Sequence, residues 1–246
     1  MAVTKKKKTS DPGKYVEVRN VSKIYKTGAE EVRALDNLSF EIAKGEFVVI
    51  LGPSGAGKTT VLNLLGGMDT ATSGNIFVDG KDISALGSRH MTLYRRNDVG
   101  FVFQFYNLMP NLTALENIEL ATELNRKSSI PASEVLGTLG LVERSKNFPS
   151  QLSGGEQQRV SIARAVAKNP KILLCDEPTG ALDYQTGKMV LSLLHKISRD
   201  QKKTVIVVTH NSALREMADR VISMKNGYAT ESVLNENPKS IEEIEW

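Results

Sequence analysis

Gly52-Pro53-Ser54-Gly55-Ala56-Gly57-Lys58-Thr59 is the stretch of this sequence that decides its fold. The hydrophobic run Gly45–Ile50 before it predicts a buried strand, and Lys58–Leu65 after it has the spacing of a helix. Glycines allow successive backbone N–H groups to converge on phosphate oxygens, and the following helix presents its positive end to them. The stretch therefore predicts a phosphate-binding edge of a sheet. A glycine-rich turn that only connects the two elements is the alternative.

The eight residues match the P-loop pattern in full, with a strand before and a helix after. Lys58 is expected to reach the β- and γ-phosphates of ATP, and the Thr59 hydroxyl to ligate Mg²⁺. The ATP-binding residues expected here are Gly52, Pro53, Ser54, Gly55, Ala56, Gly57, Lys58, Thr59 and Thr60.

A second apolar strand, Lys171–Asp176, ends in two consecutive acids. A buried parallel strand delivers Asp176 to the carboxyl edge of the sheet, which is where such sheets bind ligands. Asp176 is then placed to hold Mg²⁺ through water, and Glu177 to polarise an attacking water molecule. The simpler interpretation, a strand that stops in a polar turn before Pro178, loses its force beside a P-loop.

The rest of the chain indicates an α/β core interrupted by a helical insertion. Val16–Val18 and Leu38–Ile42 alternate like half-buried strands, and Gly74–Gly80 predicts a strand closed by a turn at Asp79-Gly80. After Ser153 helices and strands alternate, which is typical of a parallel sheet covered on both faces. The helices predicted beyond the P-loop are Leu115–Leu124, Ser133–Leu139, Glu156–Lys168, Tyr184–Ser198 and Ser212–Ala218, and the last predicted strand is Thr204–Thr209.

The positive charge lies almost entirely at the N-terminus. Residues 1–14 contain five lysines and one aspartate, which accounts for the whole net charge of +4. Nucleic-acid-binding domains usually carry positive charge on the folded body, so no nucleic acid partner is expected. The lysine-rich segment predicts a solvated disordered tail, or a weak attraction to anionic lipid of about 1 kcal/mol per lysine.

No stretch approaches the roughly 20 apolar residues that a membrane-spanning helix needs. No apolar segment follows the N-terminal lysines, so a secretory signal is not expected. Cys175 is the single cysteine, which excludes an internal disulfide and fits a reducing, cytoplasmic setting. If this protein moves something across a membrane, another chain must supply the pore.

Leu152-Ser153-Gly154-Gly155-Glu156-Gln157-Gln158-Arg159 is the most discriminating element. Ser153 and Glu156 form a capping box that would start a helix, which explains the serine and the glutamate. It does not explain two adjacent glycines, which are useful where backbone must approach a ligand. A capped helix N-terminus with bare glycines is a second anion site. Two phosphate-binding surfaces in one chain predict two chains that face each other, each closing the nucleotide site of its partner.

Leu152–Gln158 resembles the signature sequence of ABC ATPases, and the other family motifs appear in family order over about residues 15–230. Gln104 resembles the Q-loop glutamine, Gly180-Ala181-Leu182-Asp183 the D-loop, and His210 the switch histidine. Tyr25 resembles the aromatic residue that stacks on adenine, with Tyr15 as a competitor.

This resemblance implies a homodimer in which ATP lies between the P-loop of one subunit and Ser153, Gly154 and Gly155 of the other. Glu177 would activate water, and His210 would position the γ-phosphate. The catalytic residues implied are Glu177, His210 and Gln104. The residues implied at Mg²⁺ are Thr59, Gln104 and Asp176. The ATP-binding set is completed by Tyr25 and Asp183.

The family also implies a P-loop NTPase fold with a RecA-like parallel-sheet core, an N-terminal antiparallel β subdomain and a helical insertion subdomain. Residues 15–103 and 160–230 would form the ATP-binding core, and 104–159 the helical subdomain that ends in the signature motif. Residues 1–14 would be a disordered tail, and 231–246 an acidic C-terminal tail.

Phe103–Pro110, Leu112–Asn117 and Pro178–Asp183 are similar to ATPases of the macrolide-exporter and lipoprotein-release group. That similarity implies an integral membrane permease with a large extracytoplasmic domain as partner, and a position on the inner face of the cell membrane. The substrate stays open among peptide, antibiotic, lipid and lipoprotein. The alternatives are a cell-division-type ATPase that regulates extracellular hydrolases through its permease, and a non-transport ABC ATPase.

Overall fold

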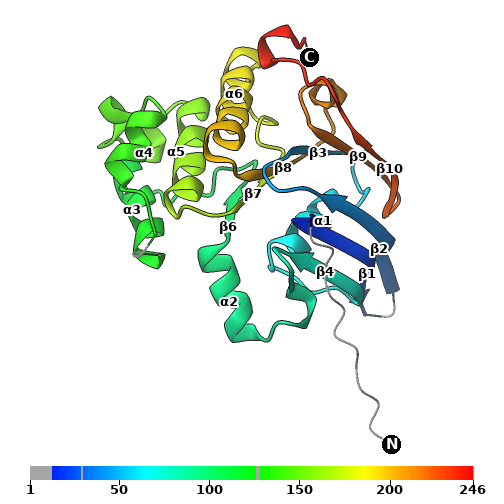
Figure 1. Ribbon diagram of the computed structural model, residues 1–246. Helices are drawn as coiled ribbons and strands as arrows, with labels where there is room; N and C mark the ends of the chain where they lie inside the picture. Colours follow the sequence, from blue (N-terminus) through cyan, green and yellow to red (C-terminus); the bar gives the residue numbers. More distant parts are fainter. Residues whose placement is uncertain (1–12, 29, 126–127, 246) are drawn as a thin grey trace, which may run out of the picture.

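A computed structural model describes residues 13–28, 30–125 and 128–245 of the 246-residue chain. Two sheets form its frame (Figure 1). The four-stranded sheet has the order β2-β1-β4-β5, and all of its neighbouring strands are antiparallel. Its strands are β1 (Val16–Thr27), β2 (Glu30–Ile42), β4 (Ser73–Val78) and β5 (Lys81–Asp82).

The six-stranded sheet has the order β10-β9-β3-β8-β7-β6 and is parallel except for the pair β9–β10. Strands β3 and β8 are buried along their whole length, as expected for parallel strands covered on both faces. The strands are β3 (Phe47–Leu51), β6 (Val99–Val102), β7 (Ile172–Asp176), β8 (Thr204–Thr209), β9 (Arg220–Lys225) and β10 (Tyr228–Leu234).

Alternation along β3 divides the interior into two cores. Val48 and Ile50 pack with the four-stranded sheet and with α1 (Lys58–Leu65). Phe47 and Val49 pack on the other face of the sheet, where the helices α5 (Gly154–Ala167) and α6 (Tyr184–Gln201) lie. Successive side chains of a strand point to opposite faces, so a single short strand serves both cores.

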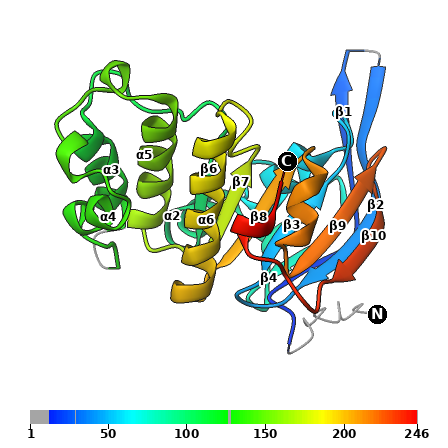
Figure 2. The same ribbon diagram turned by 90° about the horizontal axis from the view of Figure 1, so that it is seen from above.

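The helical insertion lies at the far end of the molecule from β1 and β2 (Figure 2). Helices α3 (Ala114–Leu124) and α4 (Ala132–Thr138) pack there against α5. The α3 helix begins with a capping box between Thr113 and Glu116. None of the helices in the described ranges is long and apolar enough to cross a membrane.

The structure confirms the bounds predicted for α1 and β8, and corrects others. The α5 helix begins at Gly154 and not at Glu156, so both signature glycines lie in its first turn. The predicted helix Ser212–Ala218 is wrong, because the segment is a 3₁₀ helix over Ser212–Glu216. Asn211 caps the start of this 3₁₀ helix by accepting from the Ala213 N–H, and β9 begins at Arg220.

Among the described α-helices and strands, α2 (Ser88–Asn97), β5, β9 and β10 were not predicted. The residues of β10 are mostly exposed at the edge of the sheet, which leaves no alternating apolar pattern to recognise. This strand also corrects the predicted tail 231–246, because 231–234 belong to β10 and the Ile241 and Ile244 side chains are buried. Residues 1–12 of the predicted N-terminal tail lie outside the described residues, as does 246.

Candidate nucleotide-binding site

The loop between β3 and α1 is shaped by two glycines that lie close to the backbone of neighbouring strands. A Cβ atom on Gly52 would lie 2.4 Å from the Met224 carbonyl oxygen, and one on Gly57 would lie 2.6 Å from the Ala34 carbonyl oxygen. Gly57 also has φ +94°, and it caps α1 without any side-chain hydrogen bond. The first N–H groups of α1 are therefore not capped by a side chain, which is the arrangement that binds anions at a helix N-terminus.

Lys58 folds back over this loop. Its Nζ donates to the carbonyl oxygens of Gly52, at 2.7 Å, and Pro53, at 3.1 Å, and its side chain is buried. The ammonium group thus lies at the mouth of the loop, held by backbone acceptors that a phosphate oxygen can replace.

The order of the strands brings four further side chains to the same edge. Neighbouring strands β3, β8, β7 and β6 run parallel, so their carboxyl ends meet beside the loop. His210 follows β8, Asp176 and Glu177 come at the end of β7, and Gln104 follows β6. This is the edge at which ligands of parallel sheets bind.

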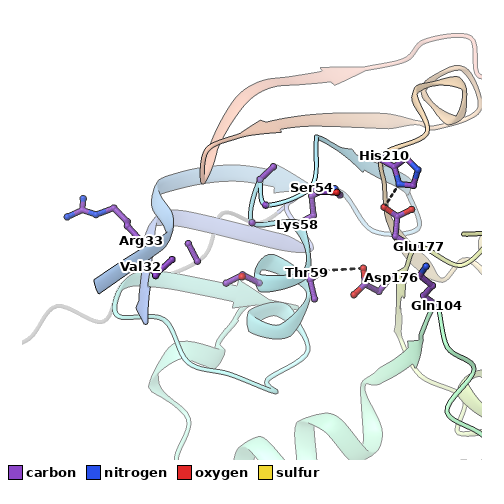
Figure 3. A pocket seen from close by; sticks show the side chains of 14 residues that line it. Val32, Arg33, Ser54, Lys58, Thr59, Gln104, Asp176, Glu177 and His210 are labelled. Carbon is purple, nitrogen blue, oxygen red and sulfur yellow. Dashed lines mark hydrogen bonds and ion pairs between the residues drawn. The ribbon is translucent and has the colours of Figure 1, made fainter. Parts of the chain in front are cut away.

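A cavity of about 540 Å³ joins these groups (Figure 3). In Figure 3 the acids and His210 lie on one side of Lys58 and Thr59, and Val32 and Arg33 lie on the other. The residues that line the cavity are Val32, Arg33, Ala34, Ser54, Gly55, Ala56, Gly57, Lys58, Thr59, Thr60, Gln104, Asp176, Glu177 and His210.

Asp176 lies directly across from the loop. The Thr59 hydroxyl donates to Asp176 Oδ1 at 3.3 Å. Burial raises the pKa of the Asp176 carboxyl, the Thr59 hydrogen bond opposes that rise, and the neighbouring Glu177 charge adds to it. A carboxylate that is costly to ionise in this position gains from a cation beside it.

Glu177 has an unusual backbone and a fixed partner. Its φ is +44°, in the left-handed region that costs about 1–3 kcal/mol for a residue other than glycine. Glu177 Oε1 lies 2.9 Å from Nδ1 of His210, whose side chain is 69% exposed while that of Glu177 is 16% exposed. A half-buried carboxylate oriented by an accessible imidazole is suited to act on a water molecule.

The signature residues lie at the start of α5 and do not line this cavity. Ser153 Oγ accepts from the Glu156 N–H at 3.3 Å, and Glu156 Oε2 accepts from the Ser153 N–H at 2.8 Å. The predicted capping box is therefore present, and Ser153 is exposed. Gly155 is required by packing, because a Cβ atom there would lie 2.1 Å from Cγ2 of Thr186 on α6.

Asp183 and the two tyrosines also lie outside the set of lining residues. Asp183 caps α6 by accepting from the Thr186 N–H at 3.1 Å, and borders a smaller cavity with Glu177 and His210. Tyr25 is 36% exposed, donates to Asp69 Oδ2 at 2.8 Å and pairs across the sheet with Val32. Tyr15 is buried and lines a different cavity with α2 residues.

Val32, Arg33 and Ala34 of β2 are the lining residues that sequence reasoning missed. They belong to an exposed strand segment without a recognisable motif. Only the pairing of β2 with β1 and the contact of Ala34 with Gly57 bring them to the cavity.

Comparison with known proteins gives consistent results. The family model described as ABC transporter matches residues 35–180. A putative ABC transporter ATP-binding protein of Mycoplasma pneumoniae is 42% identical over 240 residues, which is 97% of this chain and 52% of that protein. The macrolide export ATP-binding/permease protein MacB of Shigella flexneri is 42% identical over 233 residues, or 93% of this chain and 35% of that protein. The chain therefore spans about half of the length of the Mycoplasma pneumoniae protein and about a third of the length of MacB.

The solved structures include a relative of similar length. The ATP-binding cassette MJ0796 of Methanocaldococcus jannaschii was solved as a dimer in a post-hydrolysis state bound to ADP and Pi. It superposes with a TM-score of 0.82 and 42% sequence identity, covering 89% of this chain and 98% of that one.

Proposed function

The chain belongs to the ABC transporter family, and from this premise we propose that it is an ATP-binding and ATP-hydrolysing subunit that works as a homodimer and drives a membrane permease. One observation carries the proposal. A single cavity collects the P-loop, Asp176, Glu177 and His210, whereas the second helix N-terminus, at Ser153–Gly155, lies outside that cavity. The phosphate contacts expected of Ser153–Gly155 would therefore be made to the nucleotide of a second chain.

We propose that the triphosphate of ATP lies on the N–H groups of the P-loop, with the Lys58 ammonium moved from its backbone acceptors to the phosphate oxygens. The adenine would then lie toward Val32 and Arg33, with Tyr25 beside them in the sheet. An aromatic ring and an aliphatic side chain on neighbouring strands offer a flat surface to a base.

The residues at the loop edge fit a magnesium ion that accompanies ATP. The Thr59 hydroxyl, the Asp176 carboxylate and the Gln104 side-chain oxygen are hard oxygen ligands, which Mg²⁺ prefers, together with phosphate oxygens. Among the described residues no group of three or more His, Cys, Asp or Glu side chains could hold a metal by itself. When bound, Mg²⁺ would neutralise charge on the phosphates.

Glu177 is the proposed general base. Its carboxylate would accept a proton from the attacking water, and His210 would hold the carboxylate in place and contact the γ-phosphate from its exposed position. Gln104 is half-buried and lies beside Gly180 of the D-loop. It would connect this site to the helical insertion.

The dimer would place Ser153, Gly154 and Gly155 of each chain on the nucleotide of the other, with Asp183 at the interface. The similarity to a cassette solved as a dimer with ADP and Pi supports this arrangement. The similarity to a macrolide export ATP-binding/permease protein supports a permease partner. A permease with a large extracytoplasmic domain, and a position on the inner face of the cell membrane, are the finer parts of the proposal.

The variant Glu177→Gln tests the hydrolytic part. Loss of a positioned base lowers rates by about 10²–10⁴-fold, so the variant should bind ATP, accumulate as a dimer and barely turn over. Phosphate release and light scattering after size-exclusion chromatography measure both properties. Glu236→Gln, at an exposed loop position, is the matched control and should behave as wild type. Rapid hydrolysis by Glu177→Gln would contradict the assignment of Glu177 as the general base. A variant that stays monomeric at saturating ATP would contradict the proposed dimer.

A further inference from the structure

Gln158 is a wholly buried polar residue just beyond the first turn of α5. Its side-chain Nε2 donates to the Pro178 carbonyl oxygen at 2.8 Å, and its Oε1 has no hydrogen-bond partner in the described structure. Buried amides are normally satisfied on both atoms, so packing alone is a poor reason to keep a glutamine here. Its one hydrogen bond joins α5 to the segment that follows β7.

Pro178 directly follows Glu177, the proposed base. The backbone of Glu177 is held by two further hydrogen bonds, from its N–H to the Val208 carbonyl oxygen and from the Gly180 N–H to its own carbonyl oxygen, both 3.0 Å. A positive φ at a residue other than glycine persists only where its surroundings determine it. Gln158 supplies the restraint that comes from α5, and the other two come from β8 and the D-loop.

The same helix is anchored at other points that keep it rigid. Arg164 donates to the backbone carbonyl oxygens of Tyr106, at 2.9 Å, and Asn107, both just after Gln104. Gly155 packs on Thr186, in the first turn of the helix that Asp183 caps. A displacement of the N-terminus of α5 is therefore conveyed along the helix to Gln158 and not absorbed by a loose contact.

We propose that Gln158 is a positioning residue that ties Glu177 of one nucleotide site to the signature residues serving the other site. The inference rests on the proposed function, because Ser153–Gly155 contact a nucleotide only across a dimer. When the partner's phosphates seat on Ser153–Gly155, they set the position of the rigid helix α5 and of the segments anchored to it. Its Gln158 then holds the Pro178 carbonyl, and thereby the Glu177 carboxylate, in the productive orientation. The two ATP sites then hydrolyse in a cooperative manner.

The substitution Gln158→Met keeps the length and volume of the side chain and removes the hydrogen bond. We expect kcat to fall about tenfold and the Hill coefficient for ATP to fall to about 1, while the ATP affinity of the monomer stays as in wild type. Asn125→Leu is the matched control. Its amide Nδ2 donates to the Lys168 carbonyl oxygen, at 3.1 Å, at the opposite end of α5, and its loss should leave kcat and cooperativity near wild type.

A second variant, Gln158→Glu, distinguishes positioning from a general loss of packing. A carboxyl group buried at this position has a raised pKa, and its neutral form can donate to the Pro178 carbonyl as the amide does. The kcat of the variant relative to wild type should therefore rise as the pH is lowered from 8.5 to 6.5. Melting curves and ATP binding by the monomer confirm that each variant is folded.

The outcomes separate this inference from the function on which it rests. If wild type hydrolyses ATP cooperatively and Gln158→Met does the same at the wild-type rate, the positioning role is wrong while the ATPase stands. A pH-independent ratio for folded Gln158→Glu also overturns it. If wild type itself fails to hydrolyse ATP, the proposed function fails first.

Discussion

Helices α1 and α5 both begin at glycine-rich sequences, yet their N-termini are capped differently. At α1, Gly57 provides no side-chain hydrogen bond, Lys58 lies over the loop, and a cavity opens in front of the helix. At α5, Ser153 and Glu156 close a capping box, and the residues Ser153–Gly155 lie outside the cavity. Both helix ends carry a partial positive charge, but only one has a site built around it.

The difference indicates how the work is divided between two chains. The α1 side has a cation, carboxylates and a cavity, so it can bind a nucleotide within one subunit. The α5 side offers N–H groups and an exposed hydroxyl on a helix that is already stable without a ligand. In the proposed dimer, this capped helix would receive a phosphate of the nucleotide that the other subunit binds. The following experiments separate the two sides.

Lys58→Ala should have the largest effect, and it should act on the α1 side alone. Removal of the ammonium deletes charge-assisted hydrogen bonds to phosphate, each worth about 1.5–3 kcal/mol, so ATP affinity of the monomer should fall about 100-fold or more. Calorimetric titration with ATP measures it, and Lys225→Ala, an exposed lysine at the end of β9, is the control. Unchanged affinity would mean that the cavity is not the nucleotide site.

Ser153→Asp tests the α5 side without weakening the helix. Aspartate caps helices as well as serine does, but it places a negative charge where the partner's phosphates would approach. Like charges across an interface cost several kcal/mol, so hydrolysis should fall about 100-fold while monomer ATP affinity stays constant. Thr113→Asp makes the same change in the capping box of α3 and should leave hydrolysis intact. Equal hydrolysis rates for Ser153→Asp and Thr113→Asp would contradict a role of the α5 N-terminus at the partner's nucleotide.

Gly155→Ala asks whether this glycine serves packing or ligand approach. The added methyl would press on Thr186 Cγ2, and overpacking of this kind costs about 1–3 kcal/mol of unfolding free energy. Thr186→Ser removes the opposing methyl group and should restore much of the loss in thermal melts. Gly137→Ala in α4 meets no atom within 4 Å and should be neutral or slightly stabilising. A Gly155→Ala melt equal to wild type would show that space is not the constraint.

The smallest expected effect is on thermal stability without nucleotide, where Asp176→Asn should cause a pH-dependent change. Burial raises the pKa of this carboxyl above its unfolded value, so its charged form costs stability, and that cost grows as pH rises through the raised pKa. In the absence of nucleotide the asparagine variant should melt a few degrees higher than wild type at pH 7.5, and the gap should close toward pH 4. A gap that is constant with pH would rule out Asp176 as its source.

The sequence determined the parts that depend on local spacing. The P-loop, the helix α1, the strand β8 and the capping box at Ser153 all follow from residues close together in the chain, because turn geometry, periodicity and capping act over a few residues. It also placed Asp176, Glu177, His210 and Gln104 at strand ends, from which their meeting at one edge could be expected.

Only the tertiary structure decided contacts between segments distant in sequence. Val32 and Arg33 reach the cavity through strand pairing, Gly155 is required by Thr186, and Gln158 meets Pro178 through the packing of α5 on the end of β7. The predicted tail after residue 230 likewise proved to include an edge strand and two buried isoleucines. Such contacts leave no periodic mark in the sequence, because each depends on how whole elements pack and not on the residues beside it.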